Sequence, residues 1–166
     1  MRESTASIAA WADETFGGAA SLFRVACRAN EELAELLRAI SAGQPTDKIA
    51  EEAADVAIVL CRVGHQTGTD ILECAAHWLA GKRQGAAAQH AIDANRQMAS
   101  LLALTMESNG TGLRVTLIQI VGSLINVCHA FGKNLFEEID RKMEVNHSRE
   151  WKTDGTGHGY HKRAAS

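Results

Sequence analysis

Apolar residues recur at intervals of three and four along most of the chain, as in EELAELLRAI at residues 31–40 and EEAADVAIVL at residues 51–60. This spacing is typical of amphipathic α-helices, and no sustained alternation of apolar and polar residues indicates a strand. Glycine-containing breaks and the single proline, Pro45, divide the chain into segments. Thr46 or Asp47 is the predicted N-cap of the third helix. The pattern predicts an all-α fold with helices at residues 5–16, 19–42, 47–64, 69–80, 86–108, 113–131 and 134–151.

Length and composition limit how the chain is organised. Its 166 residues, of which 46% are hydrophobic, suffice for one domain with a core and are few for two. The last fifteen residues, KTDGTGHGYHKRAAS, are rich in glycine and cannot form a helix. We therefore expect one helical domain at residues 1–151 and a tail at residues 152–166 that is either mobile or ordered by a ligand or a neighbour.

Charge and apolar segments restrict the binding partners. A net charge of −3 provides no broad cationic surface, so binding to nucleic acid is not expected. The N-terminal residues carry charges where a signal peptide needs an apolar run, and the apolar stretch Val115–Phe131 is interrupted by Gln119, Ser123, Asn126 and His129. The four cysteines form no C-x-x-C pair and are expected to be reduced thiols. These features predict a soluble, cytoplasmic protein that does not bind membranes.

The chain also contains a weak internal repeat. ANEELAELL at residues 29–37 is identical to ANRQMASLL at residues 94–102 in five of nine positions, and residues 55–64 can be aligned with residues 123–132. A real repeat would make the second half a scaffold that lacks the acids of the first; chance matching of helices rich in Ala and Leu is the alternative. In this alignment Glu32 faces Gln97, Glu35 faces Ser100, Glu52 faces Ile120 and Asp55 faces Ser123.

Two pairs of carboxylates lie on consecutive predicted helices. Glu32 with Glu35, and Glu52 with Asp55, are each three residues apart and so share a helix face. The loop at residues 41–46 is short enough to fold the two helices antiparallel, which would gather all four acids. Carboxylates at close quarters repel unless cations neutralise them, and Mg²⁺ or Mn²⁺ prefers oxygen ligands. The spacing predicts a metal-binding helical hairpin.

Two other interpretations of these acids were weighed. They could be solvated helix faces paired with Arg28, Arg38 and Lys48, which is the usual role of such residues. A ferritin-like di-iron site needs two Glu-x-x-His motifs, and the chain has only the one formed by Glu144 and His147. Iron is therefore not expected.

A basic stripe follows near the end of the last predicted helix. Lys142, Asn146 and Arg149 fall at positions i, i+4 and i+7, so a helix would present all three on one face. An ammonium, an amide and a guanidinium together suit the binding of phosphate. We expect this stripe to bind phosphate groups, although alone it would indicate only a solvated edge.

These motifs resemble a known superfamily. EELAE followed by EEAAD resembles the E-E-x-x-E plus E-x-x-D signature of the all-α, MazG-like nucleoside triphosphate pyrophosphohydrolases, and K-x-x-x-N-x-x-R at residues 142–149 resembles their phosphate-binding element. WADETFG at residues 11–17 and GTGHGYH at residues 155–161 are similar to phage-type members described as dATP/dGTP diphosphohydrolases. The resemblance spans most of the chain, but only the acidic signature is specific.

The resemblance implies a reaction and a set of roles. It implies attack of water on the α-phosphorus of a nucleotide, giving the monophosphate and pyrophosphate, with Mg²⁺ as cofactor and Mn²⁺ as a possible substitute. It also implies assembly into homodimers or homotetramers. The residues that it implies for metal binding are Glu32, Glu35, Glu52 and Asp55, and those for binding the triphosphate are Lys142, Asn146 and Arg149. Glu31 would orient a ligand or water, and we expect Glu35 to act also as the general base.

The sequence defines the binding site for the nucleobase less well. Trp11 or Trp78 could stack on a purine, and Asn30 or Asn95 could read its edge, but a Trp more often packs in a core or an interface. His158 and His161, in the tail, could close over phosphate or bind metal.

These expectations converge on one enzymatic prediction, with alternatives. We expect a Mg²⁺-dependent pyrophosphohydrolase of a purine deoxynucleoside triphosphate, with dGTP ahead of dATP on the resemblance alone, acting in the host cytoplasm if the protein is phage-encoded. House-cleaning of noncanonical nucleotides is an alternative with the same chemistry. A non-catalytic helical interaction module is the alternative from another class.

Overall fold

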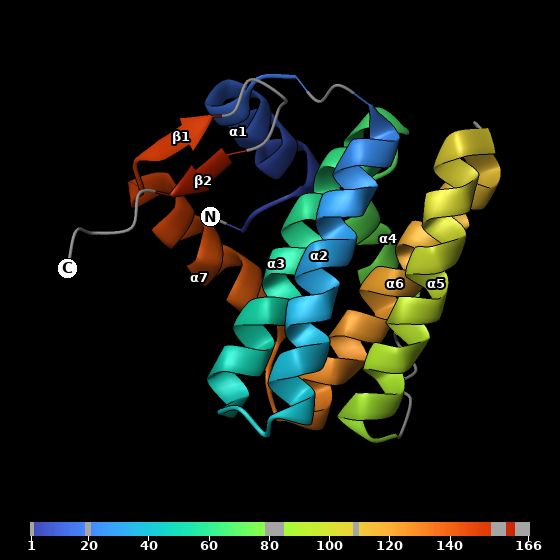
Figure 1. Cartoon of the computed structure of the whole chain (residues 1–166), viewed down its shortest axis with the longest axis vertical. Helices are drawn as coiled ribbons and strands as arrows, with labels where there is room; N and C mark the ends of the chain where they lie inside the picture. The colour runs from blue at the N-terminus through green and yellow to red at the C-terminus, as the bar shows by residue number, and fades with distance from the viewer. Residues whose placement is uncertain (1, 19–20, 79–84, 108–109, 154–158, 162–166) are drawn as a thin grey trace.

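The computed structural model describes residues 2–18, 21–78, 85–107, 110–153 and 159–161. Over these residues the chain is helical except for one short β-ribbon, which confirms the predicted all-α class. Each helix begins and ends within three residues of its predicted bounds. The helices are α1 Thr5–Phe16, α2 Leu22–Ser41, α3 Thr46–Gln66, α4 Ile71–Trp78, α5 Ala87–Glu107, α6 Gly110–Ala130 and α7 Leu135–Ser148 (Figure 1).

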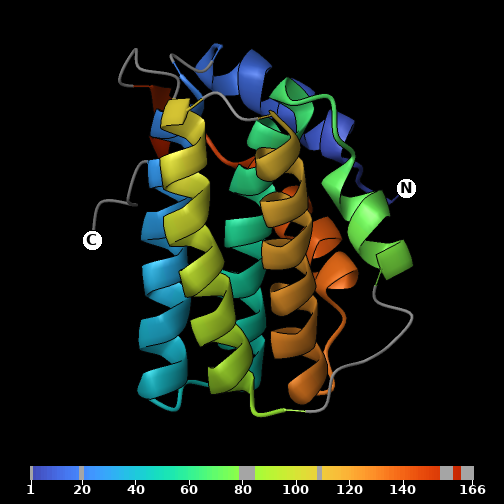
Figure 2. The same cartoon turned by 90° about the vertical axis from the view of Figure 1, so that its right-hand side faces the viewer.

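Four long helices form the body of the molecule. Helix α2 packs against α3 and α5, and α6 packs against α5 and α3, so the four close into a bundle whose neighbours run antiparallel (Figure 1 and Figure 2). Apolar stripes meet at its centre, where Leu36, Leu60, Met98, Leu117 and Leu124 are fully buried. Burying these side chains is the main source of stability. The bundle thus consists of two helical pairs, α2 with α3 and α5 with α6.

Helix α3 is the most enclosed element. It contacts α1, α2, α6 and α7, and 13 of its 21 residues are buried. Helices α1 and α7 lie against it outside the bundle, while α4 packs on α6 (Figure 1). Polar residues on the enclosed faces of α3, such as Glu52 and Arg62, are therefore paired inside the protein and line a cavity.

The start of α3 corrects the predicted N-cap. The capping position is Pro45, and neither Thr46 nor Asp47 fills it because both already belong to the helix. Pro45 has the extended backbone of a cap residue but no side-chain acceptor, so no side-chain hydrogen bond closes this end. Asp47 instead lies in the first turn, where its charge suits the helix dipole, and pairs with Lys133.

The end of α7 differs from the predicted helix at residues 134–151. The helix ends at Ser148, and Arg149 is its C-cap with extended backbone. Trp151–Thr153 then forms β1, which pairs antiparallel with β2, Gly159–His161 (Figure 1). The described residues of the tail are not helical, as expected, but they belong to a ribbon that the sequence did not predict. Residues 154–158 and 162–166 lie outside the described residues.

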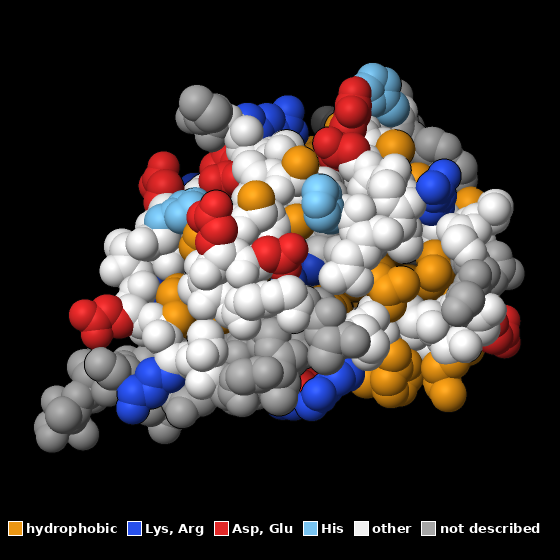
Figure 3. Space-filling model, turned by 90° about the horizontal axis from the view of Figure 1, so that it is seen from above, with side chains coloured by type: hydrophobic (Ala, Val, Ile, Leu, Met, Phe, Trp, Pro, Cys, Tyr) orange, Lys and Arg blue, Asp and Glu red, His pale blue; other side chains and the backbone are white. Residues whose placement is uncertain are grey.

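Two surface features bear on partners. Helix α6 is long and apolar enough to cross a membrane by length and composition, yet its buried residues belong to the bundle core, as in core helices that pass the same test. Several large apolar side chains are exposed on α5 and α6, among them Ile92, Met106 and Val115. Figure 3 shows apolar side chains gathered on the right of the view, the side on which α5 and α6 lie in Figure 1.

The positions of the proposed repeat fall on the two helical pairs. Residues 29–37 lie on α2 and residues 94–102 on α5, while residues 55–64 lie on α3 and the aligned segment begins on α6. Ile120, aligned with Glu52, is fully buried in the core.

Candidate active site

A cavity of about 410 Å³ lies among α1, α2, α3, α7 and the first strand of the ribbon. It collects side chains from segments far apart in the sequence, and most of them are charged or aromatic. The charged and aromatic lining residues are the acids Glu32, Glu35, Glu51, Glu52 and Asp55, the bases Arg28, Lys48, Arg62, Lys142 and Arg149, and the aromatic residues Trp11, Phe16 and Trp151.

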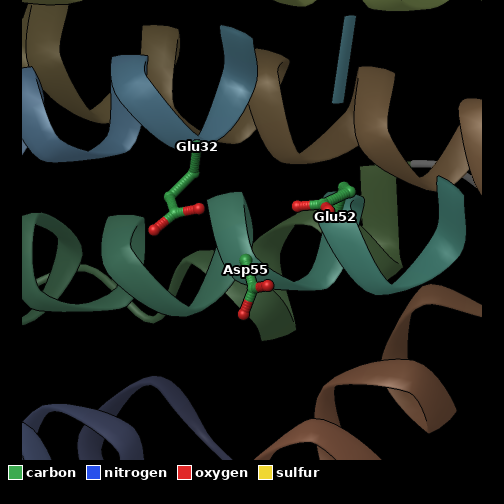
Figure 4. Close-up of side chains that lie close together, drawn as sticks. All are labelled: Glu32, Glu52 and Asp55. Carbon is green, nitrogen blue, oxygen red and sulfur yellow. The ribbon is translucent and has the colours of Figure 1, made fainter. Parts of the chain in front are cut away.

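Three of the predicted metal ligands meet in this cavity. One carboxylate oxygen each from Glu32, Glu52 and Asp55 lies within 4.8 Å of the other two. Figure 4 shows Glu32 reaching from α2 toward α3, which carries Glu52 and Asp55. Glu32 is 7% exposed and Glu52 6% exposed, so these carboxylates are withdrawn from bulk water although acids seldom are.

Glu35 and Glu31 occupy different positions. Glu35 lines the cavity but does not belong to the group of three; its side chain is 48% exposed and lies 3.7 Å from Arg38. Glu31 does not line the cavity; its side chain is exposed and accepts a hydrogen bond of 2.7 Å from Arg28. Glu31 therefore acts on the cavity only through Arg28.

The donor set fits a hard divalent cation. Mg²⁺ binds oxygen at about 2.1 Å, so two ligands of one ion lie at most about 4.2 Å apart. Oxygens within 4.8 Å reach that separation with small side-chain rotations. The three ligands contain no sulfur or imidazole, which disfavours zinc or copper. Glu32, Glu52 and Asp55 are the residues that would hold such an ion.

Burial raises the pKa of two carboxylates in the acid cluster. Desolvation raises the pKa of Glu32 from its ordinary 4.5 to about 7; the nearby Arg28 opposes the rise, and Asp55 adds to it. Desolvation likewise raises the pKa of Asp55 to about 6, although Lys142 opposes it. Desolvation and repulsion both penalise charged carboxylates, so the cluster costs folding free energy.

The predicted phosphate-binding residues reach the same cavity. Lys142 is 8% exposed and donates hydrogen bonds of 2.6 Å to Glu51 and 2.7 Å to Asp55. Asn146 is buried, and its side-chain oxygen accepts a hydrogen bond of 3.4 Å from Arg149. Arg149 lies beyond the end of α7, so the three do not form one helical stripe, yet all three line the cavity.

An aromatic wall, formed by Trp11, Phe16 and Trp151, closes one side of the cavity. The rings meet edge to face, with centroids 5.3 Å apart for Trp11 and Phe16, 5.9 Å for Trp11 and Trp151, and 5.1 Å for Phe16 and Trp151. The indole nitrogen of Trp151 donates a hydrogen bond of 3.0 Å to the carbonyl oxygen of Asn146. The wall therefore joins α1 to the end of α7 and offers flat apolar surface beside the charges.

Arg62 on α3 connects this wall to the bundle through hydrogen bonds. The side chain is buried, and its guanidinium donates hydrogen bonds of 2.7 Å to Asp13 and 2.9 Å to the carbonyl oxygen of Gly17. These contacts fix the end of α1, which carries Phe16, against α3. The sequence reasoning missed Arg62, although an arginine within the apolar run DVAIVLCRVG is a signal of a buried partner. Phe16 and Trp151 were missed because only the tertiary fold brings them together.

Other predicted residues lie elsewhere. Asn30 on α2 and Asn95 on α5 are exposed and do not line the cavity. Glu144 and His147, the lone Glu-x-x-His motif, are exposed as well. The side chain of Trp78, all of His158 and the side chain of His161 lie outside the described residues. Of the predicted nucleobase contacts whose side chains the structure describes, Trp11 is the one that lines the cavity.

No known protein family, curated protein or solved structure matches this chain. The assignment of a function therefore depends on the chemistry of the cavity and on the sequence signature.

Proposed function

We propose that the protein is a Mg²⁺-dependent pyrophosphohydrolase that cleaves a purine deoxynucleoside triphosphate, dGTP ahead of dATP, between the α- and β-phosphates. The products are the monophosphate and pyrophosphate. The acidic signature suggested a MazG-like enzyme with a metal-binding hairpin, and the cavity supports that proposal with the residues it brings together.

The observation that carries the proposal is the coexistence of three kinds of surface in one cavity. One cavity of about 410 Å³ is lined by all three. Its carboxylates suit a hard cation, its basic side chains suit phosphate, and its aromatic wall suits a flat ring. A nucleoside triphosphate with its divalent cation presents the three complementary groups. Glu32 and Glu52 are almost fully buried, and Lys142 and the aromatic residues reach their cavity from other elements, which is not the arrangement of a solvated helix face.

The charge balance of the lining favours a substrate that arrives with cations. Its five acids and five bases cancel, so the lining has no formal net charge. A polyphosphate alone would leave its negative charges unmatched in a partly buried site, at a large cost in free energy. Each Mg²⁺ that accompanies the polyphosphate offsets two of its negative charges.

Each residue has a role in this proposal. Glu32, Glu52 and Asp55 hold the cation, while Lys142 and Arg149 bind phosphate oxygens and Asn146 orients Arg149. A bound Mg²⁺ would neutralise the phosphates and lower the pKa of a coordinated water. Glu35, at the open edge and outside the group of three, is the candidate general base that takes a proton from the attacking water.

The aromatic wall is the candidate binding site for the nucleobase. Trp11 and Trp151 offer ring area on which a purine can stack, whereas Asn30 and Asn95 do not reach the cavity. The preference for purine over pyrimidine, and for dGTP over dATP, rests on the sequence resemblance.

We also propose that the protein assembles into homodimers or homotetramers in the cytoplasm. The support is the exposure of Ile92, Met106 and Val115 on α5 and α6, since large apolar side chains at a surface favour association. Size-exclusion chromatography with light scattering would test this directly.

The reaction is tested by incubating the protein with each deoxynucleoside triphosphate and Mg²⁺ and measuring monophosphate and pyrophosphate. In water enriched in ¹⁸O, attack at the α-phosphorus places the label in the monophosphate. Glu35→Gln and Asp55→Asn should each be slower by about 100-fold or more, the usual effect of losing a catalytic acid–base or ligand group.

Glu144→Gln is the matched control, because Glu144 is exposed on α7 and does not line the cavity. It should retain the parent rate. Absence of any cleavage, or label found in pyrophosphate, would contradict the proposed reaction, and equal rates in all three variants would contradict the proposed site.

A further inference from the structure

Each candidate metal ligand has its own basic partner inside the cavity. Arg28 pairs with Glu32, Lys48 lies 2.8 Å from Glu52, and Lys142 lies 2.7 Å from Asp55. Arg28–Glu32 and Lys48–Glu52 are pairs four residues apart on α2 and on α3, whereas Lys142 reaches Asp55 from α7, so the third pair depends on the tertiary fold. In each pair the base faces the carboxylate that a cation would use.

The two lysines share a further carboxylate. Glu51 accepts a hydrogen bond of 2.6 Å from Lys142 and one of 3.3 Å from Lys48. Glu51 does not belong to the group of three acids. Glu51 therefore lies within hydrogen-bonding distance of both lysines and can hold them beside the acid cluster.

We propose that Lys142 and Lys48 are tethered counter-ions of the acid cluster, which compete with the divalent cation for Asp55 and Glu52 and turn to the substrate phosphates when the cation binds. Glu51 anchors both lysines at the cavity during this exchange. The proposal rests on the proposed function and adds to it an antagonism between the lysines and the cation.

Simple electrostatics requires a change of partner. An ammonium within hydrogen-bonding distance of a carboxylate repels a divalent cation bound to the same carboxylate, and the repulsion is strong in a partly buried site. Lysine can leave, because its charge is carried on a flexible four-carbon stem. Phosphate is the partner that the released lysines would meet in the cavity.

The test measures binding of Mn²⁺ alone, without nucleotide, by the electron paramagnetic resonance signal of free Mn²⁺. Lys142→Met keeps the length of the side chain and removes the charge, and we expect its dissociation constant for Mn²⁺ to fall by about tenfold, which is about 1.4 kcal/mol. Lys133→Met is the matched control: Lys133 also pairs with an aspartate, Asp47, but does not line the cavity. It should bind Mn²⁺ as the parent does.

The second half of the proposal is tested with inorganic tripolyphosphate. Tripolyphosphate should reduce the difference in Mn²⁺ affinity between Lys142→Met and the parent. The reason is that only the parent has a Lys142 ammonium that can bind the anion after Mn²⁺ displaces it from Asp55. Chelation of Mn²⁺ by tripolyphosphate in solution is the same for all variants and cancels in the comparison.

The outcomes separate this inference from the proposed function. If the parent binds Mn²⁺ and both Lys142→Met and Lys48→Met bind it no more tightly, the antagonism is overturned while the metal site remains. If the parent binds no Mn²⁺, both the metal site and this inference fail. Lys142 is buried, so circular dichroism must confirm folding; if Lys142→Met does not fold, the half-exposed Lys48→Met decides the question with the same expected direction.

Discussion

Replacing Glu32 with Gln should stabilise the protein while abolishing its activity. The Glu32 carboxylate is almost fully buried, and desolvation raises its pKa from 4.5 to about 7, with the charges of Asp55, Glu35 and Glu52 adding to the rise. A neutral amide of the same shape would remove both the desolvation cost and the repulsion. It would also remove one candidate metal ligand.

The size and the pH dependence of the effect follow from this pKa. A rise from 4.5 to about 7 corresponds to about 3 kcal/mol of destabilisation once the carboxylate is charged in both states. This net value already includes the favourable pair with Arg28. The cost is absent below pH 4.5, where both states are protonated, and complete above pH 7. Glu32→Gln should therefore gain about 3 kcal/mol at pH 8 and almost nothing near pH 4.5.

Urea unfolding followed by circular dichroism measures this gain at the two pH values, without divalent cations. Adding Mg²⁺ at pH 8 should stabilise the parent and leave Glu32→Gln unchanged, because a ligand stabilises only the state that binds it. Glu144→Gln serves as the control for replacing an exposed glutamate. If Glu32→Gln is less stable than the parent at pH 8, Glu32 is a structural partner of Arg28, and the account of a strained acid cluster is wrong.

Three further predictions concern other parts of the cavity. Arg62→Met should lower the free energy of unfolding by about 3 kcal/mol in urea, because Asp13 and the end of α1 lose a buried partner; a loss below about 0.5 kcal/mol would contradict the structural role. Trp11→Ala should raise KM for the nucleotide by about tenfold with little change in kcat, as measured by steady-state kinetics, because stacking is lost but the phosphates stay bound. Binding of Mn²⁺, measured by calorimetry, should weaken from pH 8 to pH 5 because Glu32, whose pKa is about 7, and Asp55, whose pKa is about 6, both take up a proton; affinity that does not depend on pH would exclude both as ligands.

The helices and the neighbourhood of the acids could be predicted because both depend on local periodicity. Apolar spacing defined all seven helices, and a spacing of three residues placed Glu52 and Asp55 on one face of α3. Those inferences need no knowledge of how helices pack.

The distinction between Glu32 and Glu35 could not be predicted in this way. Residues three apart on a helix differ by about 60° in direction, so the rotation of α2 against α3 decides which of them turns inward. The side chain of Glu32 is 10% exposed and that of Glu35 48% exposed. The same spacing that grouped four acids in sequence therefore gives three in the cluster and one at the edge.

The aromatic wall and the ribbon depend entirely on tertiary structure. Phe16 ends α1, and Trp151 begins a strand only because α7 stops at Ser148. Nothing in the local pattern marks that stop, since the region has neither a proline nor a glycine at the helix end. The charged motifs of the sequence predicted several residues that line the cavity, whereas the contacts between distant aromatic residues were not predicted.

The two helical pairs of the bundle differ in the side chains that they bury. Under the alignment of the repeat, the position of the buried Glu52 on α3 corresponds to Ile120 on α6, which is fully buried. An apolar side chain there contributes burial, whereas the acid costs desolvation. Because α3 packs against both α2 and α6, the apolar second pair supports the helix that carries the acids. The buried acids Glu32 and Glu52 lie on the pair that lines the cavity, and no acid is buried on the described residues of α5 and α6, so the desolvation cost falls on the helices that would hold the proposed cation.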